Sequence, residues 1–426
     1  MRRPPFTVRP LALSVTLAIA TPVAVAADIA ASAVASPQEV NNVVLTASDN
    51  VISVATEVTG IIKEQNDTNS TQLIKQGAGT LSLTNNNTYK GGTDVQAGTL
   101  SVARAASLGD GTVNLADGST LETQSSTTLT QDITLDGNAT IKMGGQNAAQ
   151  NITQITSAIT EKDQKNGNSS LTKSGAGTLS LTNNNTYKGG TDVQAGTLSV
   201  ARAASLGDGA VTLQTGSTLE TQSSTTLTQN ILLKGDATIS TGGIKPAENI
   251  TQVTSTISGD GGLIKSGAGT LSLTADNGYK GNTTISEGTL AISRGGSLGS
   301  GSEIKIENAA TLKTNQNVTI SQNIVIDSGD IAKIDTGGKN SVLQGQIKDG
   351  TLEKTGNGSL TLTNAMNNQE KTTLNGGILI INDAKNLGQN NNEIEIKKGT
   401  LQTSTDMTLA NTIVTSGSSG GSINTA

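Results

Sequence analysis

Residues 77–111 read GAGTLSLTNNNTYKGGTDVQAGTLSVARAASLGDG, and the same sequence recurs without a change at residues 175–209. A looser copy begins at Gly267 and a more divergent copy at Gly356, so the starts lie 98, 92 and 89 residues apart. A second perfect match, STLETQSSTTLTQ at residues 119–131 and 217–229, shows that the duplication covers the whole period. Self-similarity at a nearly fixed period indicates a repeat architecture.

The repeats divide the chain into consecutive units. Repeat 1 covers residues 73–170, repeat 2 covers 171–262, repeat 3 covers 263–351, and repeat 4 covers 352–426 and stops partway through its period. Residues 27–72 carry apolar positions without the full motif, and their end parallels the segment that precedes Gly175. We therefore expect residues 27–72 to form degenerate coils that cap the stack, since a bare terminal strand exposes an unpaired edge.

Residues 1–26 have the pattern of a secretory signal peptide. Arg2, Arg3 and Arg9 precede an apolar run, which ends in the small residues Ala24-Val25-Ala26. This pattern predicts export, with cleavage after Ala26. The run is short for a membrane span, and Pro22 interrupts it.

Composition restricts both the core and the chemistry. Aromatic residues make up 1% of the chain and Trp is absent, so Leu, Ile, Val and Ala must supply the core. The absence of Cys and His excludes disulfides, thiol nucleophiles and Ser–His–Asp catalysis within this chain. The net charge is −6, and removal of the leader arginines leaves 25 basic and 34 acidic residues, or −9. Such dispersed acidity argues against nucleic acid or an anionic membrane as a partner.

The local pattern is that of short β-strands. Leu81 and Leu83 of the segment TLSL share one face of a strand. The similar segment TLSV follows nineteen residues later and places Leu100 and Val102 in the same way. Gly, Asn or Asp punctuates the strands every few residues, and Asn85-Asn86-Asn87 suits a corner where side chains hydrogen-bond along a stack. Strands that return about every 20 residues predict an all-β, parallel β-helix with coils stacked about 4.8 Å apart. An array of two-layer β-sandwiches, one per repeat, is the alternative.

The repeat unit resembles the passenger-associated repeat of bacterial autotransporters, the type V secreted proteins of Gram-negative outer membranes. Three elements carry this resemblance: a Lys before Gly-Ala-Gly-Thr-Leu, an Asn-rich turn with Tyr-Lys-Gly-Gly-Thr, and Ala-Gly-Thr-Leu ahead of Leu-Gly. The resemblance covers about residues 73–410. It implies a right-handed, single-stranded parallel β-helix that is threaded through a C-terminal outer-membrane barrel, where the absence of Cys is expected. It also implies action as an adhesin or self-association factor, with proteases and esterases a minority.

The aromatic girdles and alternating strands of such a barrel are absent from this sequence. We therefore expect a fragment, a frameshifted gene or a truncated chain. With its barrel, the protein is expected at the cell surface, the outer membrane or outside the cell.

Tyr89, Tyr187 and Tyr279 recur once per repeat, each followed by Lys and Gly, and Asn368 aligns with them in repeat 4. One hypothesis makes them a row of exposed aromatics that contact sugars or another rod. The favoured interpretation places each Tyr over a turn, with its hydroxyl on a backbone group.

The remaining candidates have plainer interpretations. Gly77-Ala78-Gly79 superficially resembles a phosphate-binding loop, but a strand follows it instead of a helix, which indicates turn glycines. Recurring carboxylates could serve glycosidase chemistry or Ca²⁺, but the copies do not keep them, since Ser300 stands where Asp208 does. The sequence therefore predicts a solvated face and no catalytic, cofactor or metal residues. These carboxylates are Asp94, Asp110, Glu122, Asp192, Asp208 and Glu220.

These observations predict a non-enzymatic exported segment that acts in surface adhesion or self-association. Its partners would be host-surface or bacterial-surface molecules, or other copies of itself, and not nucleic acid. The alternatives are a β-helix enzyme of the polysaccharide-lyase kind and a pure spacer for a functional domain elsewhere. The Ser and Thr ladders are also compatible with glycosylation, although they serve equally as plain β-formers.

Overall fold

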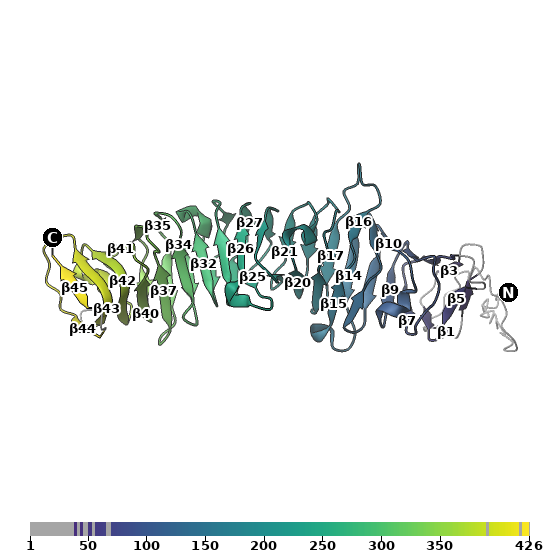
Figure 1. The fold of residues 1–426 in the computed structure, drawn as a ribbon, viewed down its shortest axis with the longest axis horizontal. Helices are drawn as coiled ribbons and strands as arrows, with labels where there is room; N and C mark the ends of the chain where they lie inside the picture. The colour runs from purple at the N-terminus through teal and green to yellow at the C-terminus, as the bar shows by residue number, and fades with distance from the viewer. Residues whose placement is uncertain are drawn as a thin grey trace, which may run out of the picture.

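The computed structural model describes residues 38–40, 43–45, 50–52, 56–64, 70–388, 392–416 and 420–425. The predicted signal peptide lies outside these residues. The described chain is an elongated rod of short strands that wind around one long axis (Figure 1). Helices in this part of the chain are limited to short 3₁₀ segments, and none is long and apolar enough to cross a membrane.

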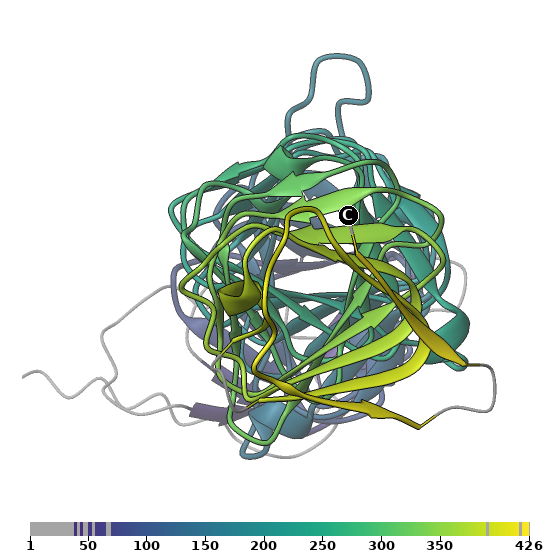
Figure 2. The same cartoon turned by 90° about the vertical axis from the view of Figure 1, so that its left-hand side faces the viewer.

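Viewed along its axis, the rod is closed by stacked sheets around a central core (Figure 2). Each coil passes through three faces in the order two, three, one. Face one carries β3 (Asn50–Ile52), β6 (Leu73–Lys75), β8 (Thr93–Val95), β10 (Val113–Ala116), β13 (Ile133–Asp136) and β16 (Ile159–Glu161), and then β23 (Thr225–Leu227), β26 (Ile250–Val253), β29 (Thr270–Leu273), β32 (Thr289–Ile292), β34 (Thr311–Thr314), β37 (Ile331–Asp335) and β40 (Thr351–Thr355).

Face two is built in the same way. It carries β1 (Gln38–Val40), β4 (Thr56–Val58), β7 (Thr80–Leu83), β9 (Thr99–Val102), β11 (Thr120–Thr123), β14 (Ala139–Met143), β17 (Leu171–Ser174), β19 (Thr191–Val193), β21 (Val211–Leu213), β24 (Ile231–Leu233), β27 (Ile257–Gly259) and β30 (Gly278–Tyr279), and then β35 (Thr319–Ile320), β38 (Ser341–Leu343) and β41 (Ser359–Leu362).

Face three and the C-terminal coils complete the rod. Face three carries β2 (Val43–Leu45) and β5 (Ile62–Glu64), and then β12 (Thr127–Leu129), β15 (Ile152–Ile155), β18 (Thr178–Leu181), β20 (Thr197–Val200), β22 (Thr218–Thr221), β25 (Ala237–Thr241), β28 (Leu263–Ser266), β31 (Thr283–Ile285), β33 (Glu303–Ile306), β36 (Asn323–Ile326) and β39 (Ile347–Lys348). The long strands β42 (Lys371–Ile381) and β43 (Glu393–Thr403) bend from face one to face two, and they are followed by β44 (Thr412–Thr415) and β45 (Gly421–Asn424).

The strand register confirms the predicted parallel β-helix. Leu81 pairs with Leu100, Leu100 with Leu121, and Leu121 with Ile141, so these coils contain 19, 21 and 20 residues. Each of these pairings is parallel, and the ladders between the strands that the structure describes on the three faces are parallel throughout. A β-sandwich needs antiparallel hairpins, so the alternative of sandwich arrays is wrong.

The strand order also reveals a rotation that the sequence did not predict. The first strand of repeat 1, β6, lies on face one, whereas its equivalents β17 and β28 lie on faces two and three, and β40 returns to face one. Each repeat therefore makes four coils and one additional face, which is a third of a turn. Any feature that recurs once per repeat winds around the rod and does not form a stripe along it.

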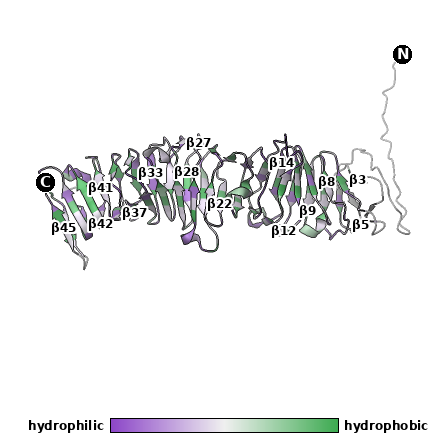
Figure 3. Ribbon diagram, turned by 45° about the horizontal axis from the view of Figure 1, so that its top comes forward, coloured by the Kyte–Doolittle hydropathy of each residue, from purple (hydrophilic) through white to green (hydrophobic). Residues whose placement is uncertain are grey.

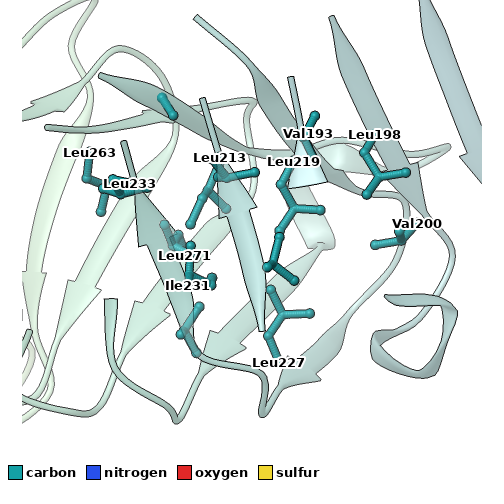
Figure 4. Close-up of a cluster of buried hydrophobic side chains, with 14 of the residues drawn as sticks. Val193, Leu198, Val200, Leu213, Leu219, Leu227, Ile231, Leu233, Leu263 and Leu271 are labelled. Carbon is teal, nitrogen blue, oxygen red and sulfur yellow. The ribbon is translucent and has the colours of Figure 1, made fainter. Parts of the chain in front are cut away.

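The core consists of aliphatic columns. Figure 4 shows Val193, Leu213 and Leu233, which are successive register partners on face two, pointing into the rod together with residues of the other faces. These side chains are fully buried. The hydrophobic and hydrophilic residues alternate along the strands (Figure 3), as expected for strands with one buried and one solvated face. Burial of aliphatic surface at about 25 cal/mol per Å² in every coil stabilises the rod without cross-links.

Candidate functional site

The motif lysine of each repeat occupies a core position. Lys75 is register partner to Ile52 and Val95, and it is fully buried like Lys173, Lys265 and Lys354. A buried ammonium is costly unless its donors are satisfied. Each of these four lysines meets that requirement in the same way.

The acceptors are three backbone carbonyls from two stacked turns. Lys75 Nζ donates to the carbonyls of Gln76 at 2.8 Å, Gly77 at 2.7 Å and Ala97 at 2.8 Å. Lys173 repeats this arrangement with Ser174 and Gly175 of its own turn and Ala195 of the next coil. The lysine thereby joins the Gly-Ala-Gly turn to the Ala-Gly-Thr-Leu turn above it, which explains why these two motif elements recur together.

Burial lowers the pKa of each of the four lysines to about 8. The amino groups therefore remain protonated at neutral pH, and all three donors are present for the three carbonyls.

The close stacking of these turns explains why they contain glycines. Gly98 has φ +69°, and a Cβ at this position would lie 2.5 Å from the carbonyl oxygens of Gly77 and Gly79. Gly77-Ala78-Gly79 is thus a turn, as predicted, and not a phosphate loop.

The Asn–Tyr loop interrupts one face of the rod in every repeat. In repeat 1 it interrupts face three, and Asn87 bridges the gap: its Oδ1 accepts from the Ile62 N–H at 2.8 Å, and its Nδ2 donates to the Ser107 carbonyl at 2.5 Å. Asn185, Asn277 and Asn367 make the same two contacts in the other repeats. The side-chain amide replaces the missing strand in the ladder, which confirms hydrogen bonding of these asparagines along the stack.

The recurring tyrosines are fully buried. Tyr89, Tyr187 and Tyr279 have no exposed surface, and their hydroxyls lie 2.6 to 2.8 Å from the Oγ1 atoms of Thr93, Thr191 and Thr283. The hypothesis of exposed aromatics that contact sugars or a second rod is therefore wrong. The favoured interpretation had the correct structural role, but the hydroxyl partner is a threonine side chain instead of a backbone group.

The position aligned with the tyrosines in repeat 4 also needs correction. Asn367 makes the contacts of Asn87, so the equivalent of Tyr89 is Gln369 and not Asn368. Gln369 is fully buried and donates from Nε2 to Thr372 Oγ1 at 3.1 Å, in place of the tyrosine hydroxyl. Alignment of the repeats by sequence missed this because the loop of repeat 4 is displaced by one residue at Gln369. The repeats are in register again at Thr372.

The buried tyrosines predict a clear optical result. Burial raises the pKa of all three hydroxyls above the ordinary value, whereas unfolded tyrosine titrates near pH 10. The resulting stabilisation is complete below about pH 10 and is lost as the pH rises further, because only the unfolded chain ionises. Since the chain has three Tyr and no Trp, we expect almost no tyrosinate absorbance from the native rod at about pH 11, and the full signal in urea. A native titration that matches the unfolded one would contradict this burial.

The six recurring carboxylates do not converge. Asp94 and Glu122 lie on faces one and two, and the rotation of repeat 2 moves their copies, Asp192 and Glu220, to faces two and three. Glu122 pairs with Lys142 at 2.9 Å, and Asp110 and Asp208 are exposed. Among the residues that the structure describes, no group of three acidic residues could hold a metal ion.

Comparisons with known proteins agree with this architecture. The model of the passenger-associated-transport-repeat family matches residues 73–102, 171–200, 263–292 and 352–381, which are the segments from each buried lysine strand to the coil above it. The chain is 34% identical over 239 residues to the Adhesin BmaC autotransporter of Brucella suis biovar 1 (strain 1330), covering 50% of this chain and 7% of that relative.

A shorter match, 52% identical over 56 residues, links the chain to an extracellular serine protease of Serratia marcescens and covers 13% of this chain and 5% of that relative. The chain thus spans less than a tenth of either relative. No solved structure matches significantly. The four repeat matches and the autotransporter relative thus support an autotransporter passenger domain, in which the passenger-associated transport repeats are carried by a parallel β-helix.

Proposed function

We propose that this exported passenger stalk acts without enzymatic chemistry, in surface adhesion or lateral self-association through the sides of the rod. The family implies export to the cell surface or the extracellular space, and the predicted signal peptide at residues 1–26 would begin that route. One relative is named an adhesin. The proposal extends that property to this chain.

The distribution of charge along the rod is the observation that carries this proposal. Lys305 Nζ lies 2.7 Å from Glu307 and 3.0 Å from Asp327, on neighbouring coils. Lys371 likewise bridges Glu393 and Glu395, and hydrogen bonds from Lys371 and Ser416 lower the pKa of Glu395 to about 2. Pairing within the chain lowers the charge repulsion that these sides would exert on a like-charged partner. Many weak contacts along a long polar side then become effective when several act together.

The enzyme alternative is a β-helix enzyme of the polysaccharide-lyase kind, and a short match to an extracellular serine protease also keeps an enzymatic role open. A hydrolase or lyase needs convergent catalytic groups in one cleft. The recurring acids of this chain are instead separated by the rotation of the repeats. In the spacer alternative, the sides of the rod make no contact with a partner. Competition by the soluble chain distinguishes this alternative from adhesion.

The test is attachment of bacteria that display the full protein. Without displayed protein, we expect slower cell settling and less attachment to host cells. The purified chain, added in solution, should reduce both in a dose-dependent manner, because it occupies the same contacts. Unchanged settling and attachment with and without display would contradict the proposal. Attachment that depends on display but resists the soluble chain would favour the spacer.

A further inference from the structure

A groove of about 400 Å³ lies on face one within repeats 2 to 4. Two outward-facing residues form its floor: Ser272 and Ala291 are only 8% and 2% exposed, although the residues beside them in the strands point into the core. The groove crosses six neighbouring strands, from β26 to β40. It is lined by Ile250, Thr270, Ser272, Thr289, Ala291, Thr311, Lys313, Asn315, Asp335 and Thr355.

The equivalent surface of repeat 2 is filled by its own side chains. Gln222 Nε2 donates to Ser199 Oγ at 2.9 Å and to Ser180 Oγ at 3.1 Å. Ser199 Oγ also donates to Glu220 Oε2 at 2.6 Å. Repeat 1 is closed similarly, by Gln124 Nε2 on Ser101 Oγ at 2.6 Å. In these two repeats a glutamine therefore covers the small residues of the floor.

Three replacements remove this cover in repeat 3. The strand register places Ala291, Lys313 and Asn315 where repeat 2 has Ser199, Glu220 and Gln222. The asparagine is one methylene shorter than glutamine, and the alanine has no hydroxyl to hold it. The lysine turns to Asp335, with 3.6 Å between Nζ and Oδ2.

The open groove has the length and chemistry of a site for an extended, uncharged, hydroxyl-rich chain. It runs along the rod, and six strands span about 24 Å. Thr270, Thr289 and Thr311 are register partners, so a hydroxyl recurs on one wall about every 4.8 Å. Ala291 supplies an apolar floor, and the Lys313–Asp335 pair leaves no net charge.

Two other classes of partner fit less well. An extended peptide binds a β-protein by adding a strand to an open edge, but the backbone groups below this groove are already paired on both sides. Nucleic acid requires a row of cations, and the groove has one lysine that is paired with an aspartate.

We propose that this groove binds a linear, uncharged oligosaccharide, and that it is a glycan contact of the adhesive rod; this deepens, and rests on, the proposed adhesion. A shallow groove without aromatic platforms should bind weakly, with a dissociation constant on the order of 1 mM. Many displayed copies would make such contacts effective together.

The test uses the full chain and two soluble probes, cello-oligosaccharides and chitin oligosaccharides, titrated by ligand-observed NMR. We expect the wild-type chain to bind at least one probe. Repeat 2 has Ser240 at the position of Asp335, so the filled variant is A291S/K313E/N315Q/D335S. It restores the residues of repeat 2 and should weaken binding about tenfold, equivalent to about 1.4 kcal/mol. The reciprocal variant S199A/E220K/Q222N/S240D opens repeat 2 and should add a second site of similar affinity.

Circular dichroism and urea unfolding of both variants verify that the rod is folded. Equal binding by the wild-type and filled chains overturns the proposal, as does the absence of binding to both probes or preferential binding of an unstructured peptide. Settling and attachment of displaying cells are measured in parallel. If these depend on display while no probe binds, the groove proposal fails and adhesion stands; if probes bind as expected while attachment is independent of display, adhesion fails.

Discussion

Replacement of Lys173 by methionine should destabilise the coils around it by about 3 kcal/mol. Methionine fills nearly the same volume, so the loss comes from the hydrogen bonds of the ammonium with the carbonyls of Ser174, Gly175 and Ala195. The three carbonyls then lose the charged donor that the fully buried Lys173 supplies. Because each coil of a solenoid contacts only its neighbours, the effect should be local.

Hydrogen exchange resolved along the chain measures this loss. Amides of β17 to β20 should exchange faster in the variant, while those of the C-terminal coils keep their rates. Lys234→Met is the matched control, because Lys234 is exposed in a turn and its replacement should change stability by less than about 0.5 kcal/mol. Equal exchange in the two variants would show that the buried lysine does not hold the stacked turns together.

Replacement of Tyr187 by alanine should cost about 3–5 kcal/mol, because it leaves a cavity where a fully buried ring packs. The backbone of Gly207 approaches this ring so closely that a Cβ there would lie 2.7 Å from Tyr187 Cε2. The cavity can collapse only a little, because the loop that carries Tyr187 is fixed in place. Backbone hydrogen bonds join the loop to the preceding coil, and the side chain of Asn185 bonds to the coils on both sides.

Two further variants separate the ring from its hydroxyl. Tyr187→Phe removes only the 2.8 Å hydrogen bond to Thr191 and should cost about 1 kcal/mol. Tyr187→Gln imitates repeat 4, where Gln369 bonds to Thr372, and should be more stable than the alanine variant. Urea unfolding followed by circular dichroism ranks the three. An alanine variant as stable as the phenylalanine variant would contradict the packing role of the ring.

Much of the fold could be predicted from the sequence because it depends on local alternation. The leucines of TLSL and TLSV point inward as expected, and their spacing of nineteen residues is the length of one coil. The buried lysines could not be predicted from hydropathy. A lysine in a strand usually faces solvent, and the carbonyls that satisfy Lys75 lie in turns that meet only after the coils stack.

The rotation of the repeats was also beyond the sequence. A strand and the Asn–Tyr loop can each occupy one face of a coil, so the number of faces in a period cannot be counted from hydropathy.

The groove of repeat 3 had a sequence signal that could have been found. Ala291, Lys313 and Asn315 depart together from the residues of repeat 2, but only the strand register brings them onto one surface.

The most direct test of the stacked and rotated coils is a disulfide across a repeat junction, in a chain that has no native Cys. Thr140 of repeat 1 and Thr172 of repeat 2 are register partners on face two, and cysteines at these positions should oxidise to a disulfide because stacked strands lie about 4.8 Å apart. Thr140 paired with its equivalent in repeat 2, Thr238, is the negative control, because Thr238 lies on face three and about four coils farther along the rod. Cross-linking of Thr140 with Thr238, or none of Thr140 with Thr172, would contradict the rotated stack.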